Sequence, residues 1–291
     1  MQKINWYPGH MAKARRELIE SLKMIDVAVE IADARAPVAS RNPDLSELLA
    51  SKNRVILLNK ADLASPEATA EWVRCYQKQG IAAAAIVSTR SGRNEAVKLI
   101  SDAARESVER MKAKGVKKTV RALVVGIPNV GKSTFINAIA GEARAKTGDK
   151  PGVTKGKQWV RVTPYLELMD TPGLLWPKLE DQTYAKHLAF LGSINDDILE
   201  MEELAWELIR DLLRICPEAV YERYRKVTTD TPEEELLEAA AFSRGFLLKG
   251  GVPDTERTAR VVLDEFRAGK IARVTLELPQ DENCSGKEAA E

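Results

Sequence analysis

Residues 126–133 have the types and spacing of a loop that binds phosphate groups. Their sequence, G-I-P-N-V-G-K-S, fits the pattern G-x-x-x-x-G-K-S/T and lies between a valine-rich strand pattern and a helical pattern. The glycines allow backbone N–H groups to surround the phosphates, Lys132 supplies a positive charge to the β- and γ-phosphates, and Ser133 offers Mg²⁺ a hydroxyl ligand. We therefore predict a nucleoside triphosphate site rather than a glycine-rich turn without a ligand. Its phosphate-binding residues are Asn129, Val130, Gly131, Lys132, Ser133 and Thr134.

A second short motif supplies groups around the metal and the γ-phosphate. Asp170-Thr171-Pro172-Gly173 ends a predicted strand downstream of the phosphate loop. The Asp170 carboxylate can hold Mg²⁺ through a water molecule, and the N–H of Gly173 can approach the γ-phosphate. Thr154, in a loop between the two motifs, is the candidate for a second hydroxyl ligand, the alternative being an ordinary loop threonine. We predict Mg²⁺ as a cofactor held by Ser133, Thr154 and Asp170.

The sequence Asn59-Lys60-Ala61-Asp62 indicates which base is bound. It directly follows a predicted strand, so it lies at the carboxyl end of that strand, where α/β sheets bind ligands. The Asp62 carboxylate can accept hydrogen bonds from N1–H and the exocyclic amine of guanine, whereas adenine has neither donor on that edge. The motif therefore favours GTP over ATP. Backbone N–H groups at the end of a further predicted strand are candidates to complete the base pocket: Val87, Ser88 and Thr89.

The order of these motifs along the chain is unusual. The base motif comes first, the phosphate loop second and the metal motif third, whereas a conventional GTPase places the base motif last. Circular permutation of one sheet explains this order most simply, because it joins the old termini and opens new ones. Residues 112–118, K-A-K-G-V-K-K, are the candidate connection, since they are basic, contain glycine and lack large apolar side chains.

Alternating strand and helix patterns predict the scaffold that positions these motifs. Strands are expected at residues 27–32, 55–58, 81–87 and 120–125, and helices at 44–50, 67–79, 95–112 and from 132. Residues 158–162 and 166–169 are expected to form an antiparallel edge pair, and beyond about residue 176 the pattern is helical. The predicted fold class is α/β. It comprises a circularly permuted P-loop GTPase domain (1–178) with a mostly parallel sheet and helices on both faces, an all-helical domain (179–279) and a polar tail (280–291).

Composition is that of an ordinary soluble globular protein. The 291 residues are 44% hydrophobic and 30% charged, and no stretch approaches the roughly 20 apolar residues that span a bilayer. The three distant cysteines suit a reducing cytosol and form no metal-ligand cluster, so a cytoplasmic protein is expected. Net charge is only +1, but six basic residues and no acid lie between Arg110 and Arg121, which permits contact with RNA. Solvated helix ends are the alternative, and no membrane or DNA partner is expected.

With these motifs the chain resembles the circularly permuted GTPases, and within them the ribosome biogenesis GTPase A family. The resemblance covers nearly the whole chain, and its most specific mark is the N-terminal P-G-H-M sequence. It implies hydrolysis of GTP to GDP and phosphate in late assembly of the large ribosomal subunit, with ribosomal RNA and proteins as partners and the helical domain helping to bind the RNA. The matching segments are residues 5–14, 33–35, 59–62, 126–134, 170–173, 176–177 and 250–254.

The group that positions the attacking water is not supplied by the D-x-x-G motif. Ras-like enzymes use a glutamine just after it, but here Leu174 occupies that position and cannot hydrogen-bond to water. We hypothesise that His10 takes this role, because histidine accepts a proton near neutral pH and the family resemblance points the same way; a structural histidine is the alternative. Asn129 resembles the asparagine of K⁺-stimulated GTPases, whose side-chain oxygen helps to hold K⁺. Stimulation of hydrolysis by K⁺ is therefore expected. Stimulation by ribosomal particles is expected separately, from contact of the basic zones and the helical domain with ribosomal RNA.

Two other functions remain open from the sequence. A guanine-nucleotide-dependent RNA-binding scaffold with little turnover would carry the same motifs, because binding and hydrolysis share them. An ATPase or nucleotide kinase would carry the same phosphate loop, but the base motif at residues 59–62 disfavours it.

Overall fold

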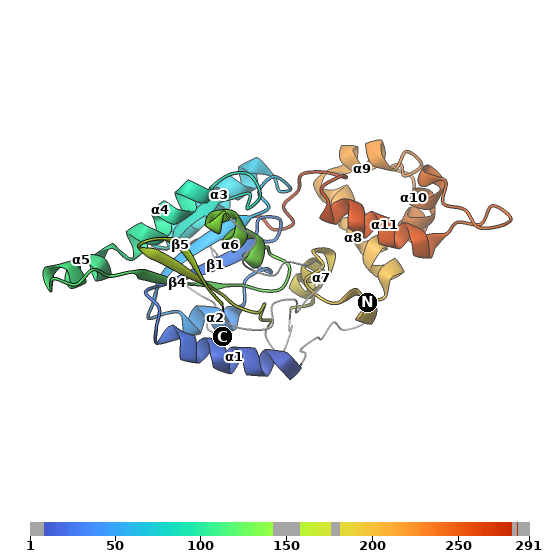
Figure 1. Ribbon diagram of the computed structural model, residues 1–291. Coiled ribbons are helices and arrows are strands. Elements are labelled where there is room, and N and C mark those ends of the chain that lie inside the picture. Colours follow the sequence, from blue (N-terminus) through green and yellow to red (C-terminus); the bar gives the residue numbers. More distant parts are fainter. Residues whose placement is uncertain (1–8, 142–157, 176–180, 281–283, 285–291) are drawn as a thin grey trace.

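A mostly parallel sheet organises the first part of the chain. The computed structural model describes residues 9–141, 158–175, 181–280 and 284. Its six-stranded sheet has the order β3-β2-β1-β4-β6-β5, in which only β5 is antiparallel to its neighbour (Figure 1). This arrangement confirms the predicted α/β class and the antiparallel edge pair. The strands are β1 Val27–Asp33, β2 Asn53–Asn59, β3 Ala82–Ala85, β4 Val120–Val125, β5 Gln158–Thr163 and β6 Leu166–Asp170.

Helices cover both faces of this sheet because successive side chains of each central strand point to opposite sides. Ile56 of β2 packs in the core that contains Trp72 of α3. Its neighbour Leu57 packs in the core that contains Ile100 of α4. The helices in this part of the chain are α1 Gly9–Leu22, α2 Pro43–Leu48, α3 Pro66–Lys78, α4 Arg93–Ala103, α5 Arg105–Ala113 and α6 Lys132–Ala140.

Most predicted elements differ from the structure by a few residues at their ends, and two differ in a way that has a physical reason. The single helix expected over residues 95–112 is divided into α4 and α5, and the Asn53 side chain donates a hydrogen bond of 2.7 Å to the Ala103 carbonyl at the break. This contact replaces one of the hydrogen bonds that a continuous helix would make. The strand expected over 81–87 ends at Ala85, after which Val87 pairs only with Ser91 in an isolated bridge.

The rest of the chain is helical and forms a separate group at one end of the molecule, while α5 projects at the other end (Figure 1). Helices α8 and α11 pack against each other and are amphipathic, with their apolar stripes inward. The helices here are α7 Gln182–Phe190, α8 Met201–Ile215, α9 Pro217–Arg223, α10 Leu236–Arg244 and α11 Thr255–Arg267, with 3₁₀ turns at Asp196–Ile198 and Glu233–Glu235.

After α11 the chain returns to the sheet-containing part. The N–H of Val274 donates to the Leu63 carbonyl, and that of Leu276 donates to the Arg35 carbonyl. The Glu277 carboxylate accepts from the backbone N–H groups of Val38 and Ala39 and contacts His187 Nδ1 at 2.8 Å. Residues 271–278, which the sequence analysis assigned to the helical domain, therefore lie against the sheet-containing part. Residues 273–278 alternate between polar and apolar types, but burial does not follow this alternation, because Thr275 and Glu277 are buried and Leu278 is exposed. The pattern therefore did not indicate where the segment packs.

This return also corrects the expectation that the three cysteines, which are far apart in the sequence, suit a reducing environment. Cys75 of α3 and Cys284 form a disulfide, with Cα atoms 4.8 Å apart, and Cys216 is free. The pairing joins residues 209 positions apart, so spacing alone could not indicate it. None of the helices within the described ranges has the length and apolar character needed to cross a bilayer.

Candidate nucleotide-binding site

The phosphate loop connects β4 to α6 and requires glycine at two positions. Gly126 and Gly131 have φ values of 146° and 95°, which L side chains rarely adopt. A Cβ atom on Gly131 would lie 2.4 Å from Asn59 Nδ2, and one on Gly126 would lie 2.4 Å from the Ile31 carbonyl oxygen. The loop therefore passes so close to β1 and to the base motif that no larger residue fits at either glycine.

Lys132 begins helix α6 and is buried beneath this loop. Its ammonium group donates to the Ile127 carbonyl at 2.7 Å. Burial lowers the pKa of Lys132 to about 8, and the nearby Asp170 carboxylate opposes this shift only in part. The loop thus holds one cation against its own backbone, near the helix N-terminus, where phosphate oxygens are favoured.

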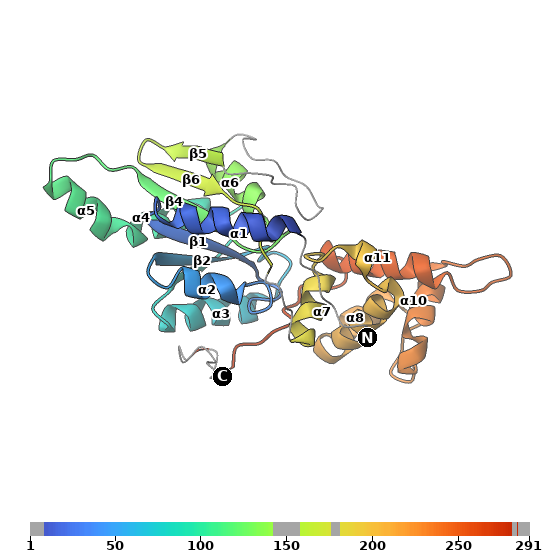
Figure 2. The same ribbon diagram turned by 90° about the horizontal axis from the view of Figure 1, so that it is seen from below.

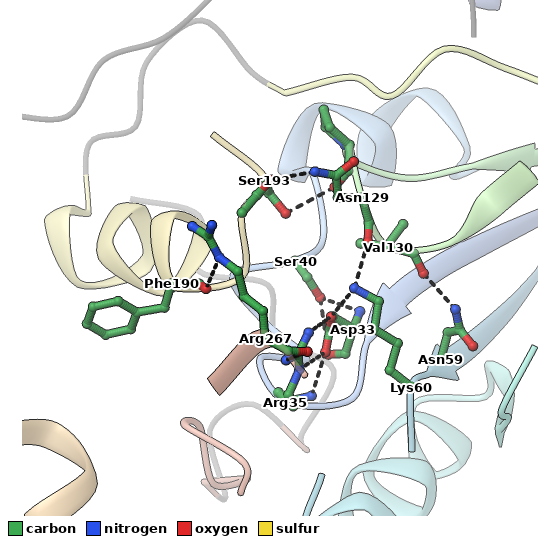
Figure 3. Close-up of polar contacts among 12 residues, drawn as sticks. Asp33, Arg35, Ser40, Asn59, Lys60, Asn129, Val130, Phe190, Ser193 and Arg267 are labelled. Atoms are coloured by element: carbon green, nitrogen blue, oxygen red, sulfur yellow. Dashed lines mark hydrogen bonds and ion pairs between the residues drawn. The ribbon is translucent and has the colours of Figure 1, made fainter. Parts of the chain in front are cut away.

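The base motif at the end of β2 contacts the phosphate loop directly. The Asn59 side chain donates to the Val130 carbonyl at 2.7 Å (Figure 3) and accepts from the backbone N–H of Ser88 at 3.0 Å. Lys60, with φ of 60°, donates to the Asn129 carbonyl at 2.7 Å. These contacts bring residues 59–60 and 129–130, which are far apart in the chain, to one edge of the sheet.

The candidate base-binding residues follow the carboxyl ends of β2 and β3. Asp62 is half-buried, and its carboxylate makes no hydrogen bond within the part of the chain that the structure describes. The Ala61 N–H donates to the Ile86 carbonyl, which fixes the turn that carries Asp62. Ser88 is buried and Thr89 is exposed. The carboxylate is thus held on a fixed turn, with its lone pairs available to donors on a base.

The residues around Asp170 fit a hard divalent cation. One carboxylate oxygen accepts from the Ser133 hydroxyl at 2.7 Å. The other is buried and has no hydrogen-bond partner within the described residues. Burial raises the pKa of Asp170. A hydroxyl and a carboxylate oxygen are ligands that Mg²⁺ prefers, and a cation there would offset the cost of burying the carboxylate. Thr154 lies outside the described residues.

The turn after Asp170 packs against the phosphate loop. A Cβ atom on Gly173 would lie 2.6 Å from the Pro128 nitrogen, so the two backbones are in contact. The N–H of Leu174 donates to the Gly126 carbonyl at 3.2 Å. The three motifs found in the sequence therefore meet at one place, with both loops at the carboxyl ends of β4 and β6.

Comparison with known proteins agrees with this geometry. Residues 121–234 match the family described as 50S ribosome-binding GTPase. Ribosome biogenesis GTPase A of Priestia megaterium is 47% identical, over 96% of this chain and 98% of its own. The chain belongs to the ribosome biogenesis GTPase A family. The protein of the same name from Thermotoga maritima is 34% identical, over 96% of this chain and 95% of its own.

Solved structures of family members have the same fold. GDP-bound TM YlqF matches with a TM-score of 0.69 and 29% identity, covering 91% of this chain and 99% of that one. GNP-bound YlqF from T. maritima matches with a TM-score of 0.67 and 29% identity, covering 92% and 99%. The coverage confirms that the permuted order of motifs belongs to this family and that the likeness includes the helical part.

This member of the family keeps apolar residues where a water-positioning glutamine would lie. Leu174 and Leu175 are both buried, with exposed fractions of 4% and 2%. Their side chains pack into the core, so neither can contact a water molecule beside a γ-phosphate. His10 lies in the first turn of α1, but its side chain is outside the described residues.

The sequence motifs did not indicate a buried ionic cluster that lies beside the site. Asp33 ends β1 and contacts Arg35 and Lys60 at 2.8 and 3.0 Å (Figure 3). Burial opposes its ionisation, but the Arg35 guanidinium and the Lys60 ammonium hold the pKa of Asp33 well below its usual range. The signal was available, because Asp33 and Arg35 directly follow a buried strand, as the base motif does.

The same edge of the sheet is tied to the helical part. The Asn129 side chain donates to the Gly192 carbonyl at 2.6 Å, and the Ser193 hydroxyl donates to the Pro128 carbonyl at 3.0 Å. Arg35 donates to the Arg267 carbonyl at 3.2 Å, at the end of α11. The phosphate loop and the Asp33 cluster (Asp33, Arg35, Ser40 and Lys60) therefore share contacts with the chain after α7 and with the end of α11.

Proposed function

We propose that this protein binds GTP and hydrolyses it to GDP and phosphate during late assembly of the large ribosomal subunit. The contact between Asn59 and the Val130 carbonyl carries the proposal, because it brings the guanine-selecting and phosphate-binding motifs within reach of one nucleotide. The names of the relatives support the ribosomal role, and GDP- and GNP-bound YlqF support the ligand. Ribosomal RNA and proteins are the proposed partners, and the cytoplasm is the proposed site of action.

Each motif has a distinct part in the proposed mechanism. Backbone N–H groups of the phosphate loop and Lys132 hold the β- and γ-phosphates, and the Gly173 N–H approaches the γ-phosphate. Ser133, Thr154 and Asp170 would hold Mg²⁺, which supplies positive charge against the phosphate oxygens. Asn129 is the candidate ligand for K⁺, and its amide is oriented by the Gly192 carbonyl. The G domain at residues 1–178 and the helical domain at 179–279 remain the proposed division, except that residues 271–278 pack on the G domain.

Replacing Asp62 with asparagine tests the choice of base. The amide offers a donor where guanine also presents donors, so GTP affinity should fall by roughly 10- to 100-fold. The xanthine base carries a carbonyl in place of the amine, so xanthosine triphosphate should bind the variant better than it binds the wild type. Competition against a fluorescent nucleotide measures both affinities. Glu71→Gln, at an exposed position of α3, makes the same chemical change and should alter neither. Unchanged GTP affinity in the Asp62 variant would refute the assignment.

Replacing His10 with alanine tests the proposed water-positioning group. The buried Leu174 side chain cannot take this role, so removing His10 should lower kcat by at least about 100-fold while GTP affinity stays unchanged. Phosphate release under multiple turnover, with and without large-subunit particles, measures the rate. An unchanged kcat would exclude His10. Negligible turnover of the wild type even with particles would favour the alternative function, a nucleotide-dependent RNA-binding scaffold, to which the two buried leucines would be no disadvantage.

A further inference from the structure

A second surface lies at the opposite end of the strands from the nucleotide site. This seam surface consists of α5, the connection at residues 114–119, Arg121 and the β5–β6 turn at residues 163–165. Strand β4 begins at Val120, beside this surface, and ends at Val125, where the phosphate loop begins. The whole length of β4 therefore separates the seam surface from the phosphates. Figures 1 and 2 both show α5 projecting beyond the sheet, away from helices α8–α11.

The seam surface carries unpaired positive charge. The side chains of Arg110, Lys112, Lys114 and Lys117 are exposed, and none of them makes an ion pair within the part of the chain that the structure describes. The nearby acids Asp26 and Asp102 are already paired, with Lys118 and Arg105 respectively. Glu106 and Glu109 lie on the first two turns of α5, before the cationic run. The end of α5 and the connection therefore favour an anionic partner.

Helix α5 contributes little to the core of the protein, since Val108 alone of its residues packs against the core and is only partly buried. None of its residues is buried, and its last turn leads directly into the exposed connection. Joining α4 to β4 does not require a projecting basic helix. Its cations therefore serve an external contact better than they serve folding, since exposed charges add little to stability.

A cavity with an aromatic rim lies beside these cations. It has a volume of about 430 Å³. Val108, Val120 and Leu166 give it apolar walls, and its charged lining residues are the acids Asp102 and Glu109 and the cations Arg105, Lys112 and Lys118. Tyr165 lines the cavity, and 65% of its surface is exposed. Its carbonyl accepts from the Val120 N–H at 2.8 Å, so the turn that carries it is fixed. An exposed aromatic ring next to a recess with both apolar and charged walls suits a flat ring that also carries polar groups, such as a nucleobase.

The combination of cations with an exposed aromatic ring indicates which class of anionic partner the surface fits. A peptide of acidic residues alone would use the cations but would not fill the recess, whereas single-stranded RNA presents phosphates and unstacked bases together. Arg121 lies over the Trp159 ring, 5.3 Å from its centroid, which extends the same pairing of cation and aromatic ring along β5. We propose that the seam surface binds single-stranded RNA, with the four unpaired cations on its phosphates and a base against Tyr165. This proposal rests on the ribosomal role proposed above and names a contact for it.

The charge contribution is tested with the triple variant Lys112→Gln, Lys114→Gln, Lys117→Gln. The probe is a short, fluorescein-labelled single-stranded RNA of mixed sequence, and binding to the full chain is measured by anisotropy across a salt series. Loss of three phosphate contacts should lower the slope of log affinity against log salt by about 2 and weaken binding by at least tenfold at low salt. The matched control Arg74→Gln, Lys78→Gln, Lys98→Gln removes three exposed cations from α3 and α4. It should leave the salt slope and the RNA affinity nearly unchanged.

The aromatic contribution is tested with Tyr165→Ala. Loss of one stacked base should weaken single-stranded RNA binding roughly tenfold without changing the salt slope, and it should not affect duplex RNA. Equal effects of the two triple variants, no effect of Tyr165→Ala, or equal competition by polyglutamate would overturn the proposal. GTP turnover is measured in the same samples and should stay at the wild-type value. Absence of turnover in the wild type would count against the proposed GTPase while leaving the RNA result interpretable.

Discussion

Replacing Lys132 with alanine is expected to lower affinity for GTP on the order of 100-fold, because a buried cation that meets the phosphates is worth several kcal/mol. Lys132 lies at the start of α6 and is only 6% exposed. Among the described residues no other lysine is buried. Water could not restore the lost charge at such a depth. Titration with a fluorescent GTP analogue measures the loss. Lys98→Ala, on the exposed side of α4, serves as the matched control and should bind as the wild type does.

The pH dependence of binding provides an independent test of the same residue. Burial lowers the pKa of Lys132 to about 8 in the nucleotide-free protein, so the amine is half neutral there at pH 8. A bound triphosphate favours the charged amine, so binding must be accompanied by proton uptake once the pH exceeds this value. GTP affinity should therefore weaken as the pH rises from about 7.5 to 9.

The Lys132→Ala variant isolates this effect from ionisation of the ligand. Guanine N1 also begins to lose its proton in this range, and it does so equally with either protein. The difference in binding free energy between wild type and variant should therefore shrink as the pH rises. A constant difference would mean that the Lys132 ammonium keeps an ordinary pKa, and equal affinities at pH 7.5 would remove Lys132 from the site.

The parts of the site that could be predicted from sequence share one physical basis. Backbone N–H groups, a lysine and a hydroxyl must follow one another at fixed spacing to surround phosphates, so the loop at residues 126–133 is recognisable without any long-range contact. Strands β1 and β4 are also recognisable locally, because a strand that is buried on both faces is a continuous apolar run. The base motif lies on a strand upstream of the loop, and both follow the carboxyl ends of strands in one parallel sheet. They were therefore expected to meet, and the 2.7 Å contact of Asn59 with Val130 confirms it.

The parts that could not be predicted depend on contacts between distant residues. Nothing local indicates that residues 271–278 return to the sheet, because their hydrogen bonds go to Leu63 and Arg35 rather than to neighbours. The break between α4 and α5 lacks proline and glycine and is accompanied by a single side-chain contact from Asn53. In both cases partners more than 40 positions away decide the structure, and a window of local sequence does not contain them.

Replacing Arg35 with methionine is expected to destabilise the protein by about 3–5 kcal/mol, because it leaves Asp33 as a poorly compensated buried charge. Arg35 is 1% exposed and holds both carboxylate oxygens of Asp33, at 2.9 and 2.8 Å. Methionine keeps much of the apolar volume over the Phe266 ring, so the loss should reflect charge rather than a cavity. Urea unfolding at pH 7 measures the free energy. Arg260→Met, which removes an exposed pair with Glu256 on α11, should cost less than about 1 kcal/mol.

Acid should reduce the difference in unfolding free energy between the wild type and Arg35→Met. Asp33 has a lowered pKa in the folded wild type, so its contribution to stability is complete above the unfolded value of about 3.9 and is lost only as the pH falls through the lower folded value. Without Arg35 the pKa of Asp33 in the folded state rises. Asp33 of the variant is then protonated at a higher pH, and its protonation removes the cost of the buried charge. The gap in unfolding free energy should therefore be largest near pH 7 and narrow toward pH 4. A gap that stays constant with pH would assign the loss to packing.

Removing the two charges together separates the pair from its surroundings. In Asp33→Leu, Arg35→Met no buried carboxylate is left without its partner, so the double variant should be more stable than Arg35→Met alone. It should still lose the link from Arg35 to the Arg267 carbonyl and the anchor of Lys60, which holds the Asn129 carbonyl of the phosphate loop. Recovered stability combined with weakened GTP binding would then mean that the Asp33 cluster positions the phosphate loop. If GTP affinity recovers together with stability, the cluster serves folding alone.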